Sequence, residues 1–345
     1  MLRDLTIKNY RCFKDFSIDG LARVNLIVGQ NNSGKTSFLE AVYLLVNQGN
    51  PDALIELLDI RGEYTVDLSS SSPTGDILYS VAHIFRGHEP LAESGSVTID
   101  LSSSERSLTI AVRSKERGFD LQIAYSDTPH VSLPLYADYS HVAARRFSRL
   151  REGTSAFQFV PTSGIDFDYL SLLWDTISLD PDKEDRLVGA LRLLDQSVED
   201  VRFTTRRTAS GAIMKLRDYS HRIPLSSMGE GMRRVAALTM SALVAENGIL
   251  LVDEIDSGLY HGVQADMWRL LIEIAQRFNL QIFATTHSWD CVEAFQEALR
   301  QLSHLQNGEP LGLLFRLETR NGVLRKVKYD ARDLEIAVEQ DIEVR

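Results

Sequence analysis

Cysteine is scarce in this chain: only Cys12 and Cys291 occur among 345 residues, and they lie far apart in the sequence. Such a pair favours reduced thiols over a disulfide scaffold. Long apolar runs are also lacking, since no stretch approaches the roughly 18 apolar residues of a membrane-spanning helix. Arg3 and Asp4 interrupt any apolar run near the first residue, so we expect no signal peptide. These absences argue against a membrane transporter on one chain and predict a cytoplasmic protein without a membrane partner.

The chain also lacks a net positive charge and long heptad repeats. The formal net charge is −11, from 37 basic and 48 acidic residues, which argues against a general nucleic-acid coat but leaves room for a local basic patch. One basic cluster contains Arg145, Arg146, Arg149 and Arg151. It could face DNA or a partner's acidic surface, or it could be a solvated face or form structural ion pairs. Helical patterns are short, so we expect no extended coiled-coil arm.

What the sequence does contain is a glycine-rich phosphate-binding turn. An apolar run at 24–28 predicts a strand, and the turn Gly29-x-x-x-x-Gly34-Lys35-Thr36 follows it before a predicted helix. Glycines allow backbone N–H groups to point inward around phosphate oxygens, and the helix start adds a positive dipole end. Lys35 is predicted to reach the β- and γ-phosphates, and the Thr36 hydroxyl to ligate Mg²⁺. The residues predicted to hold the nucleotide here are Gly29, Asn31, Asn32, Ser33, Gly34, Lys35, Thr36 and Ser37.

A buried strand ending in two carboxylates forms a second constellation. Four apolar residues at 249–252 predict a strand in a parallel sheet covered on both faces, and Asp253 and Glu254 follow it. Side chains alternate along a strand, so the two carboxylates point in different directions at its carboxyl end, where ligands collect. Asp253 is predicted to coordinate Mg²⁺ beside Thr36. Glu254 is predicted to activate the attacking water as a general base.

Three weaker candidates lie elsewhere in the chain. The Ser-Met-Gly-Glu-Gly segment at 227–231 opens a predicted long helix and looks like another anion-binding helix start. His287 follows a predicted strand at 281–285 and could sense or polarise the γ-phosphate, although a lone histidine is usually structural. Arg11 precedes the phosphate-binding turn closely enough to contact the nucleotide. An ordinary surface arginine is an equally good interpretation.

Between these motifs the pattern changes to strands and short helices. Strand-like runs at 97–101, 108–112 and 119–125, separated by turns, predict an antiparallel β-lobe. Apolar residues at helical spacing then predict two short helices within 166–199. A hairpin is predicted at 201–215.

Five motifs in one order resemble an ABC-type ATPase head. They are Gly29–Thr36, Ser227–Gly231, Leu250–Glu254, Asp256–Leu259 and Thr286–Ser288, which resemble Walker A, signature, Walker B, D-loop and switch histidine. The Asn-Tyr-Arg-Cys-Phe segment at 9–13 is similar to the RecF/SMC/OLD branch of these ATPases. Within that branch the chain most resembles the OLD-like stand-alone AAA-type ATPases of bacteria, whose D-loop ends in Gly-Leu-x-His, as at 258–261.

The resemblance implies an α/β fold. It would be a P-loop ATPase head with a mixed central sheet, an antiparallel β-lobe and a short helical insertion. The expected parts of this one composite ATPase domain are 1–60 with the P-loop, the β-lobe at 61–160, the helical insertion at 161–200, and 201–345 with the remaining motifs.

The resemblance also implies cofactors and a partner. ATP and Mg²⁺ would be shared by two copies of the chain, joined head to tail. Ser227, Gly229 and Glu230 would approach the γ-phosphate of the opposite copy's ATP, and Asp256 would communicate between the two sites. Gln158 is the candidate Q-loop glutamine for the metal. Met228 stands where the usual signature has glycine.

Two functions are implied by the resemblance. The first is a slow ATPase switch that controls a separate effector in bacterial anti-phage defence. The segment after His287 lacks the acidic metal cluster of a Toprim nuclease, so a nuclease is expected either on another chain or not at all. The alternative is a RecF-like, ATP-dependent DNA-binding protein of repair or replication. A transporter's nucleotide-binding subunit fits poorly with the segment at 9–13 and the β-lobe.

Overall fold

The computed structural model describes most of the chain. The described residues are 1–67, 76–87, 97–115, 118–126, 128, 130–136, 141–144, 156–165, 167–204, 211–306 and 308–344. The predicted arginine cluster at 145–151 and most of the predicted hairpin turn lie outside them. Within these residues, no helix has the length and apolar character needed to cross a membrane.

A six-stranded mixed sheet organises the molecule. Its order is β11-β15-β16-β3-β17-β18, with five parallel strands and β18 antiparallel to β17. The strands are β11 (Phe157–Val160), β15 (Ile249–Val252), β16 (Gln281–Thr286), β3 (Val24–Val28), β17 (Gly312–Arg320) and β18 (Val323–Tyr329). The register pairs Val160 with Val252, Val252 with Ala284, and Thr286 with Val28. The segments after β11, β15, β16 and β3 therefore meet at one edge of the sheet.

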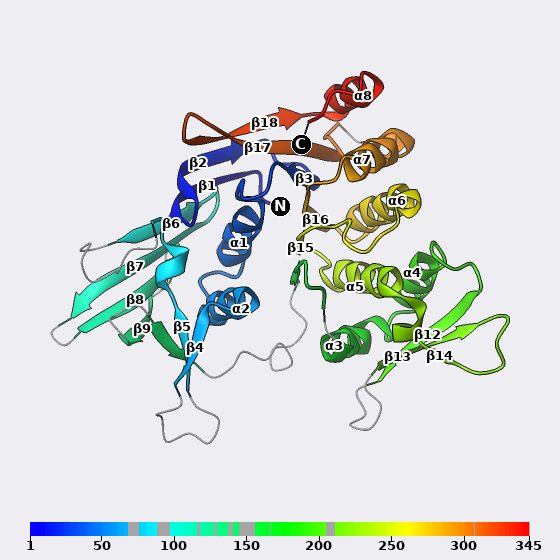
Figure 1. Cartoon of the computed structure of the whole chain (residues 1–345), viewed down its shortest axis with the longest axis horizontal. Helices are drawn as coiled ribbons and strands as arrows, with labels where there is room; N and C mark the ends of the chain where they lie inside the picture. The colour runs from blue at the N-terminus through cyan, green and yellow to red at the C-terminus, as the bar shows by residue number, and fades with distance from the viewer. Residues whose placement is uncertain are drawn as a thin grey trace.

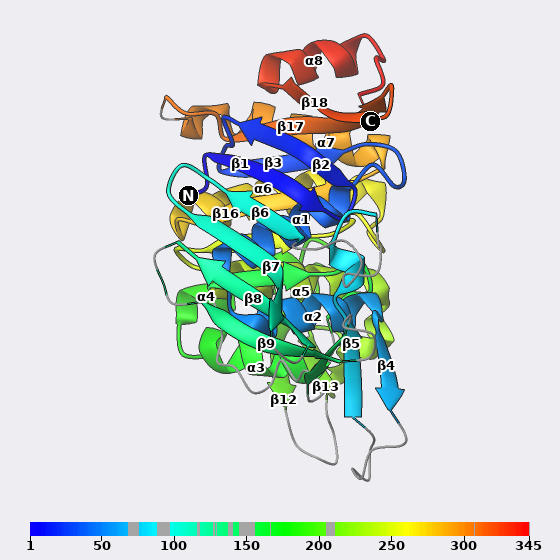
Figure 2. The ribbon, with the colours of Figure 1, turned by 90° about the vertical axis from the view of Figure 1, so that its left-hand side faces the viewer.

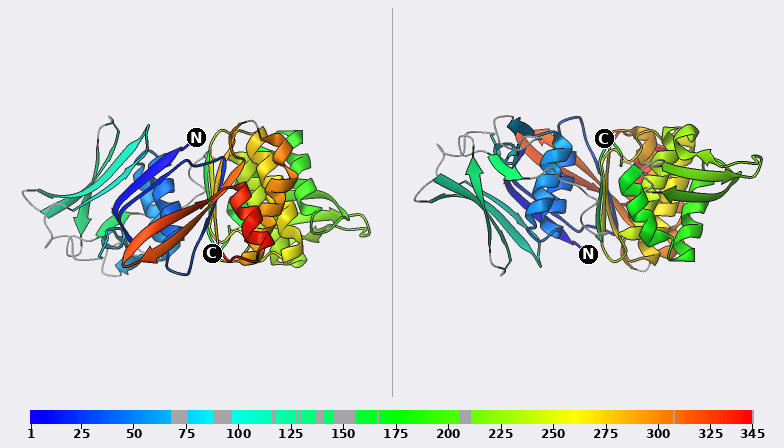
Figure 3. Two further views of the ribbon diagram at one scale, coloured as in Figure 1. Left: turned by 90° about the horizontal axis from the view of Figure 1, so that it is seen from above. Right: turned by 90° about the horizontal axis from the view of Figure 1, so that it is seen from below.

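The sheet separates two hydrophobic cores. Leu250 and Val252 belong to one core, whereas Ile249 and Leu251 belong to the other, as the alternation of side chains along a strand requires. One face carries α1 (Lys35–Val46) and α2 (Pro51–Arg61). The helices on the other side are α3 (Phe167–Ile177), α4 (Pro181–Leu191), α5 (Glu230–Val244), α6 (His261–Arg277), α7 (Trp289–Gln301) and α8 (Ala331–Glu339). Figures 1 and 3 show this layering, with the central sheet between the two groups of helices.

A nine-stranded antiparallel sheet forms the lobe beyond α1. Its order is β2-β1-β6-β7-β8-β9-β10-β5-β4, and Figure 2 shows β1 and β2 beside β6 and β7. Its strands are β1 (Asp4–Tyr10), β2 (Phe13–Asp19), β4 (Tyr64–Asp67), β5 (Asp76–Ser80), β6 (Thr98–Ser102), β7 (Ser107–Lys115), β8 (Gly118–Tyr125), β9 (Val131–Tyr136) and β10 (His141–Ala144). The predicted strands at 97–101, 108–112 and 119–125 correspond to β6, β7 and β8.

The boundaries of this lobe differ from the predicted 61–160. β1 and β2, expected in the ATPase core, extend the lobe sheet because Ile7 pairs with Leu101 of β6. β11, expected at the end of the lobe, instead lies parallel to β15 in the central sheet. Side chains of β11 are buried on both faces, which fits a strand covered by helices on each side.

The helical insertion is short. α3 and α4 pack against α5, and a small sheet of β12 (Val198–Thr204), β13 (Gly211–Leu216) and β14 (Ile223–Pro224) lies beside them. The described residues also include the 3₁₀ turns η1 (Ala82–Ile84), η3 (Leu225–Met228) and η4 (Ser303–Leu305). In the described ranges the longest helix is α6, with 17 residues, so these ranges contain no long coiled coil.

Local signals in the sequence explain where several helices begin and end. Asn50 caps α2 by accepting a hydrogen bond from the backbone N–H of Asp52, and Gly62 ends the helix at a φ of 67°. Asp330 forms a capping box with Asp333 at the start of α8.

Candidate nucleotide-binding and hydrolysis site

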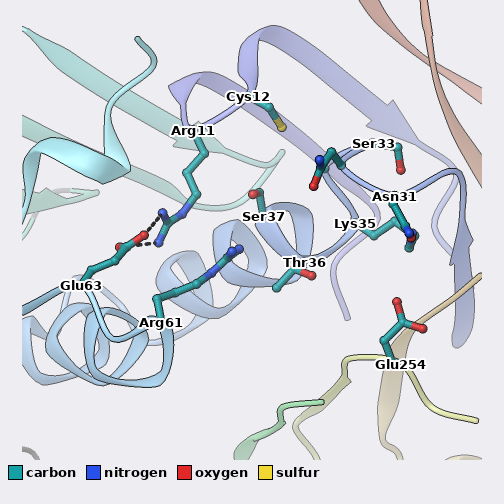
Figure 4. Close-up of a pocket in the computed structure, with 12 residues that line it drawn as sticks. Arg11, Cys12, Asn31, Ser33, Lys35, Thr36, Ser37, Arg61, Glu63 and Glu254 are labelled. Atoms are coloured by element: carbon teal, nitrogen blue, oxygen red, sulfur yellow. Dashed lines mark hydrogen bonds and ion pairs between the residues drawn. The ribbon is translucent and has the colours of Figure 1, made fainter. Parts of the chain in front are cut away.

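A cavity of about 710 Å³ lies along the turn between β3 and α1. It is lined by Arg11, Cys12, Asn31, Asn32, Ser33, Gly34, Lys35, Thr36, Ser37, Arg61, Glu63 and Glu254. Figure 4 shows Glu254 at one end of the cavity, the Arg11–Glu63 pair at the other end, and the turn between them. The turn residues predicted to hold phosphates therefore line one cavity, with the exception of Gly29, and the predicted general base lines it with them.

Two positions in this turn admit only glycine. A Cβ at Gly29 would lie 2.5 Å from the carbonyl oxygen of Leu317, and one at Gly34 would lie 2.7 Å from Cys12 Sγ. Gly34 also has a φ of 93°, in the region that side chains avoid. The turn is thus held tightly between β17 and the β1–β2 connection, which fixes the path of its backbone N–H groups.

Lys35 lies inside this turn. Its Nζ donates to the carbonyl oxygens of Gly29 at 2.8 Å and Gln30 at 3.2 Å. Burial lowers the pKa of the Lys35 ammonium, and the carboxylates of Glu254 and Asp253 act in the opposite direction. Its contact with the β- and γ-phosphates stays a prediction.

Asp253 gathers three hydroxyl groups around its carboxylate. Thr36 Oγ1 donates to Oδ2 at 3.0 Å, and Thr285 Oγ1 donates to Oδ1 at 2.6 Å. Thr162 Oγ1 donates to Oδ2 at 3.0 Å. The structure therefore brings together the two predicted metal residues, Thr36 of α1 and Asp253 after β15, although they are 217 residues apart in sequence.

These donors fit Mg²⁺. Hydroxyl and carboxylate oxygens are the ligands it prefers, and it is commonly held by one or two protein groups together with phosphate oxygens. Among the residues that the structure describes, no group of three or more His, Cys, Asp or Glu side chains could hold a metal. A metal at Thr36 and Asp253 would accordingly complete its coordination with phosphate oxygens or water.

Glu254 and His287 meet beside the cavity. His287 Nδ1 lies 2.6 Å from Glu254 Oε2, and the Glu254 side chain is 20% exposed. The two residues come just after neighbouring parallel strands, β15 and β16, which explains the contact. Asp256 lies at the same end of these strands, because Thr286 Oγ1 donates a hydrogen bond to Asp256 Oδ1 at 2.6 Å.

The signature residues lie elsewhere on the surface. Ser227, Gly229 and Glu230 are exposed and do not line the cavity. They precede or begin α5, whose N-cap, Gly229, makes no side-chain capping hydrogen bond. Because the first turn of an α-helix leaves backbone N–H groups without intrahelical partners and Gly229 has no side chain to cap them, this helix start is suited to binding an anion.

Comparison with known proteins decides the family. The model of the family described as "AAA domain, putative AbiEii toxin, Type IV TA system" matches residues 24–290, which include all five motifs. The chain belongs to this family. The site and the family together make it an ATP-binding and ATP-hydrolysing enzyme of the ABC type, related to RecF.

Individual relatives agree with this AAA-domain family. The chain is 24% identical over 339 residues to an "ATP/GTP phosphatase" of Helicobacter pylori, covering 87% of this chain and 89% of the relative. It is 36% identical over 66 residues to "DNA replication and repair protein RecF" of Lactobacillus acidophilus, covering 19% of this chain and 18% of that protein. The fold is similar to that of an SMC head bound to the C-winged helix domain of ScpA, with a TM-score of 0.51, 12% identity, and 98% and 99% of the two chains covered. The predicted α/β ATPase-head fold is confirmed.

Arg11 is not a surface residue in this ATPase. Its side chain is 7% exposed, with Nε 2.7 Å from Glu40 and Nη1 2.8 Å from Glu63. Arg61 Nε also lies 2.6 Å from Glu40. Arg11 borders the cavity, so contact with the nucleotide stays a prediction, but two carboxylates already balance its charge.

The Glu40 carboxylate is expected to matter for stability. Glu40→Gln leaves two guanidinium groups short of a buried partner, and we expect the free energy of unfolding to fall by about 3 kcal/mol. Urea denaturation measures the change. The matched control is Glu297→Gln, which breaks an exposed pair with Arg300 and should change stability by about 0.5 kcal/mol or less. Equal changes in the two variants would contradict this role for the network.

The structure does not bring Gln158 to the Asp253 carboxylate. Gln158 is buried inside β11, two residues before the strand ends, and its Oε1 accepts a hydrogen bond from Tyr169 at 2.8 Å. The hydroxyl of Thr162, just beyond that strand, contacts Asp253 instead. The reason is register: Gln158 pairs with Leu250, three residues before Asp253.

Sequence reasoning missed three residues that contact Asp253 or Glu254, and also Cys12, Arg61 and Glu63 in the lining of the cavity. Thr285 could have been found, because it precedes Thr286 and His287 at the end of the same strand. Thr162 and Arg234 carry no motif and reach the site through the fold. Arg234 donates to the carbonyl oxygens of both Asp253 and Glu254 at 2.8 Å.

Proposed function

We propose that Mg-ATP joins two copies of this ATPase head to tail, with each ATP between the P-loop of one copy and the signature of the other. The observation that carries this proposal is that the P-loop cavity and the signature residues lie on different parts of one chain. The cavity is lined by P-loop residues and Glu254, whereas Ser227 and Gly229 are exposed on another part of the same chain. A second copy is the simplest source of the missing signature, because a twofold dimer supplies it to both sites at once.

The P-loop residues and the residues that follow β15 and β16 have separate roles in hydrolysis at this shared site. Lys35 neutralises phosphate charge. Thr36 and Asp253 would hold Mg²⁺, which supplies further charge neutralisation to the phosphate oxygens. Glu254 accepts a proton from the attacking water, and its contact with His287 fixes the orientation of the carboxylate.

Blocking the signature tests the shared site. Ser227→Arg is expected to keep ATP affinity, since the P-loop is untouched, but to lower turnover by about 100-fold because the bulky side chain separates the copies. Steady-state phosphate release and ATP titration measure the two effects. The control, Ser303→Arg, alters another exposed serine in η4 and should retain full turnover. Wild-type turnover in Ser227→Arg would contradict the shared site.

We further propose that the ATP-bound dimer controls a separate effector, a Toprim-type nuclease, in anti-phage defence. Two findings support this role: the OLD-like motifs, and the family's description as a putative toxin of a toxin–antitoxin system. The purified chain should cut no DNA with ATP and Mg²⁺ or Mn²⁺. Cleavage by the purified chain alone would contradict a separate effector.

A RecF-like DNA-binding function is the second candidate. The match to RecF over 66 residues favours it, whereas the net charge of −11 does not. It predicts ATP-dependent retention of duplex DNA on a filter, with an affinity that falls steeply as salt rises. Equal retention with and without ATP would argue against this function.

A further inference from the structure

Glu254 has an unusual backbone. Its φ is 48°, in the left-handed region that residues other than glycine adopt rarely. Such conformations persist where the surroundings over-determine them, and they cluster at functional sites. The conformation at Glu254 sets the direction in which the chain leaves β15 and therefore helps to set where the carboxylate lies.

Three groups hold this backbone in place. The N–H of Glu254 donates to Thr285 Oγ1 at 2.9 Å, and its carbonyl oxygen accepts from the N–H of Ser257 at 3.0 Å. Arg234 Nη2 donates to the carbonyl oxygens of Asp253 and Glu254, both at 2.8 Å. One guanidinium nitrogen thus donates hydrogen bonds to two consecutive carbonyl oxygens at the point where the backbone turns.

Arg234 is buried for this contact. Its side chain is 3% exposed, and Nη1 donates to the carbonyl oxygen of Pro161 at 3.1 Å. Within the described residues, its hydrogen bonds all go to main-chain carbonyl oxygens. Burying a charged group is costly unless it is well paired, so a guanidinium used only on carbonyls indicates that their placement matters.

The neighbouring arginine has a different environment. Arg233 is 32% exposed, lies over the Phe167 ring at 5.2 Å, and is 3.6 Å from Glu230. It has the same charge and belongs to the same helix but makes none of the contacts described for Arg234. Arg233 is therefore a matched control.

We propose that Arg234 is a positioning residue for ATP hydrolysis, which holds the left-handed backbone at Glu254 so that its carboxylate faces the cavity and meets His287. The inference rests on the proposed role of Glu254 as general base. Arg234 belongs to α5, which begins at the signature. One helix would then contact the partner's ATP at its start and position the base of its own site less than two turns later.

A double-mutant cycle tests this inference in the full-length chain. Single-turnover hydrolysis of Mg-ATP is measured for Arg234→Ala, Glu254→Gln and the double variant. Arg234→Ala should lower the rate by about 100-fold, the loss expected for a misplaced catalytic group, with ATP affinity changed by about threefold or less. In the Glu254→Gln background the same change should cost about twofold or less, because both variants act on one group. Arg233→Ala should cost about twofold or less in both backgrounds.

Equal losses from Arg234→Ala in both backgrounds would overturn the inference, and so would a wild-type rate in Arg234→Ala. If that variant does not fold, Arg234→Lys serves in its place, since lysine keeps the charge but cannot reproduce the fork that spans three carbonyls. It should lower the rate by about tenfold at an unchanged melting temperature. A wild-type rate in Arg234→Lys would overturn the inference. A fully active Glu254→Gln would instead remove the proposed base itself.

Discussion

Replacing Glu254 by glutamine is expected to abolish most ATP turnover while leaving ATP bound. Glutamine has nearly the same shape and can still contact His287, but it does not accept a proton from water. Loss of a general base typically costs 10²- to 10⁴-fold, so we expect the single-turnover rate to fall by about 1,000-fold. Nucleotide titration should show ATP affinity close to that of the wild type, because Lys35 and the P-loop are unchanged.

The control for this variant is Glu335→Gln. It makes the same chemical change at an exposed position on α8, outside the cavity, and should leave turnover unchanged. Full hydrolysis by Glu254→Gln would remove Glu254 from the role of base and leave His287 as the next candidate.

Replacing Lys35 by alanine is expected to have the other large effect, and on binding rather than on chemistry. The ammonium lies inside the turn, within 3.2 Å of two carbonyl oxygens, and no other lysine in the described part of the chain borders the cavity. Without it the phosphate charge loses a charge-assisted partner, and ATP affinity should fall by about 100-fold. Isothermal titration calorimetry measures the change.

Lys8→Ala is the matched control for the lysine variant. Lys8 is exposed on β1 and does not border the cavity, so its loss should leave ATP affinity unchanged. Unchanged affinity in Lys35→Ala would mean that the phosphates do not occupy the turn as proposed.

The parts of the site that depend on local pattern were predictable. The P-loop spacing fixes a strand, a turn and a helix, and the apolar run at 249–252 predicts a buried strand ending in acid. Parallel strands place their carboxyl ends at one edge, so Asp253, Glu254 and His287 were expected near the phosphates. The structure brings Asp253 to Thr36 and Glu254 to His287.

The parts that depend on long-range register were not predictable. Which residue of β11 lies beside Asp253 is decided by its pairing with β15, and that pairing leaves Gln158 inside the strand and Thr162 at the edge. β1 joins the lobe by pairing with β6, about 90 residues later, and no local pattern records that choice. Arg234 lies in α5 and contacts the carbonyl oxygens of Asp253 and Glu254 only because the fold packs this helix beside the end of β15.

Light scattering on Glu254→Gln, with and without Mg-ATP, tests the central claim most directly. Since this variant should bind ATP without consuming it, the dimer should accumulate. We predict a monomer without nucleotide and a dimer with Mg-ATP. A monomer under both conditions, with ATP binding confirmed, would contradict an ATP site shared between two copies of the chain.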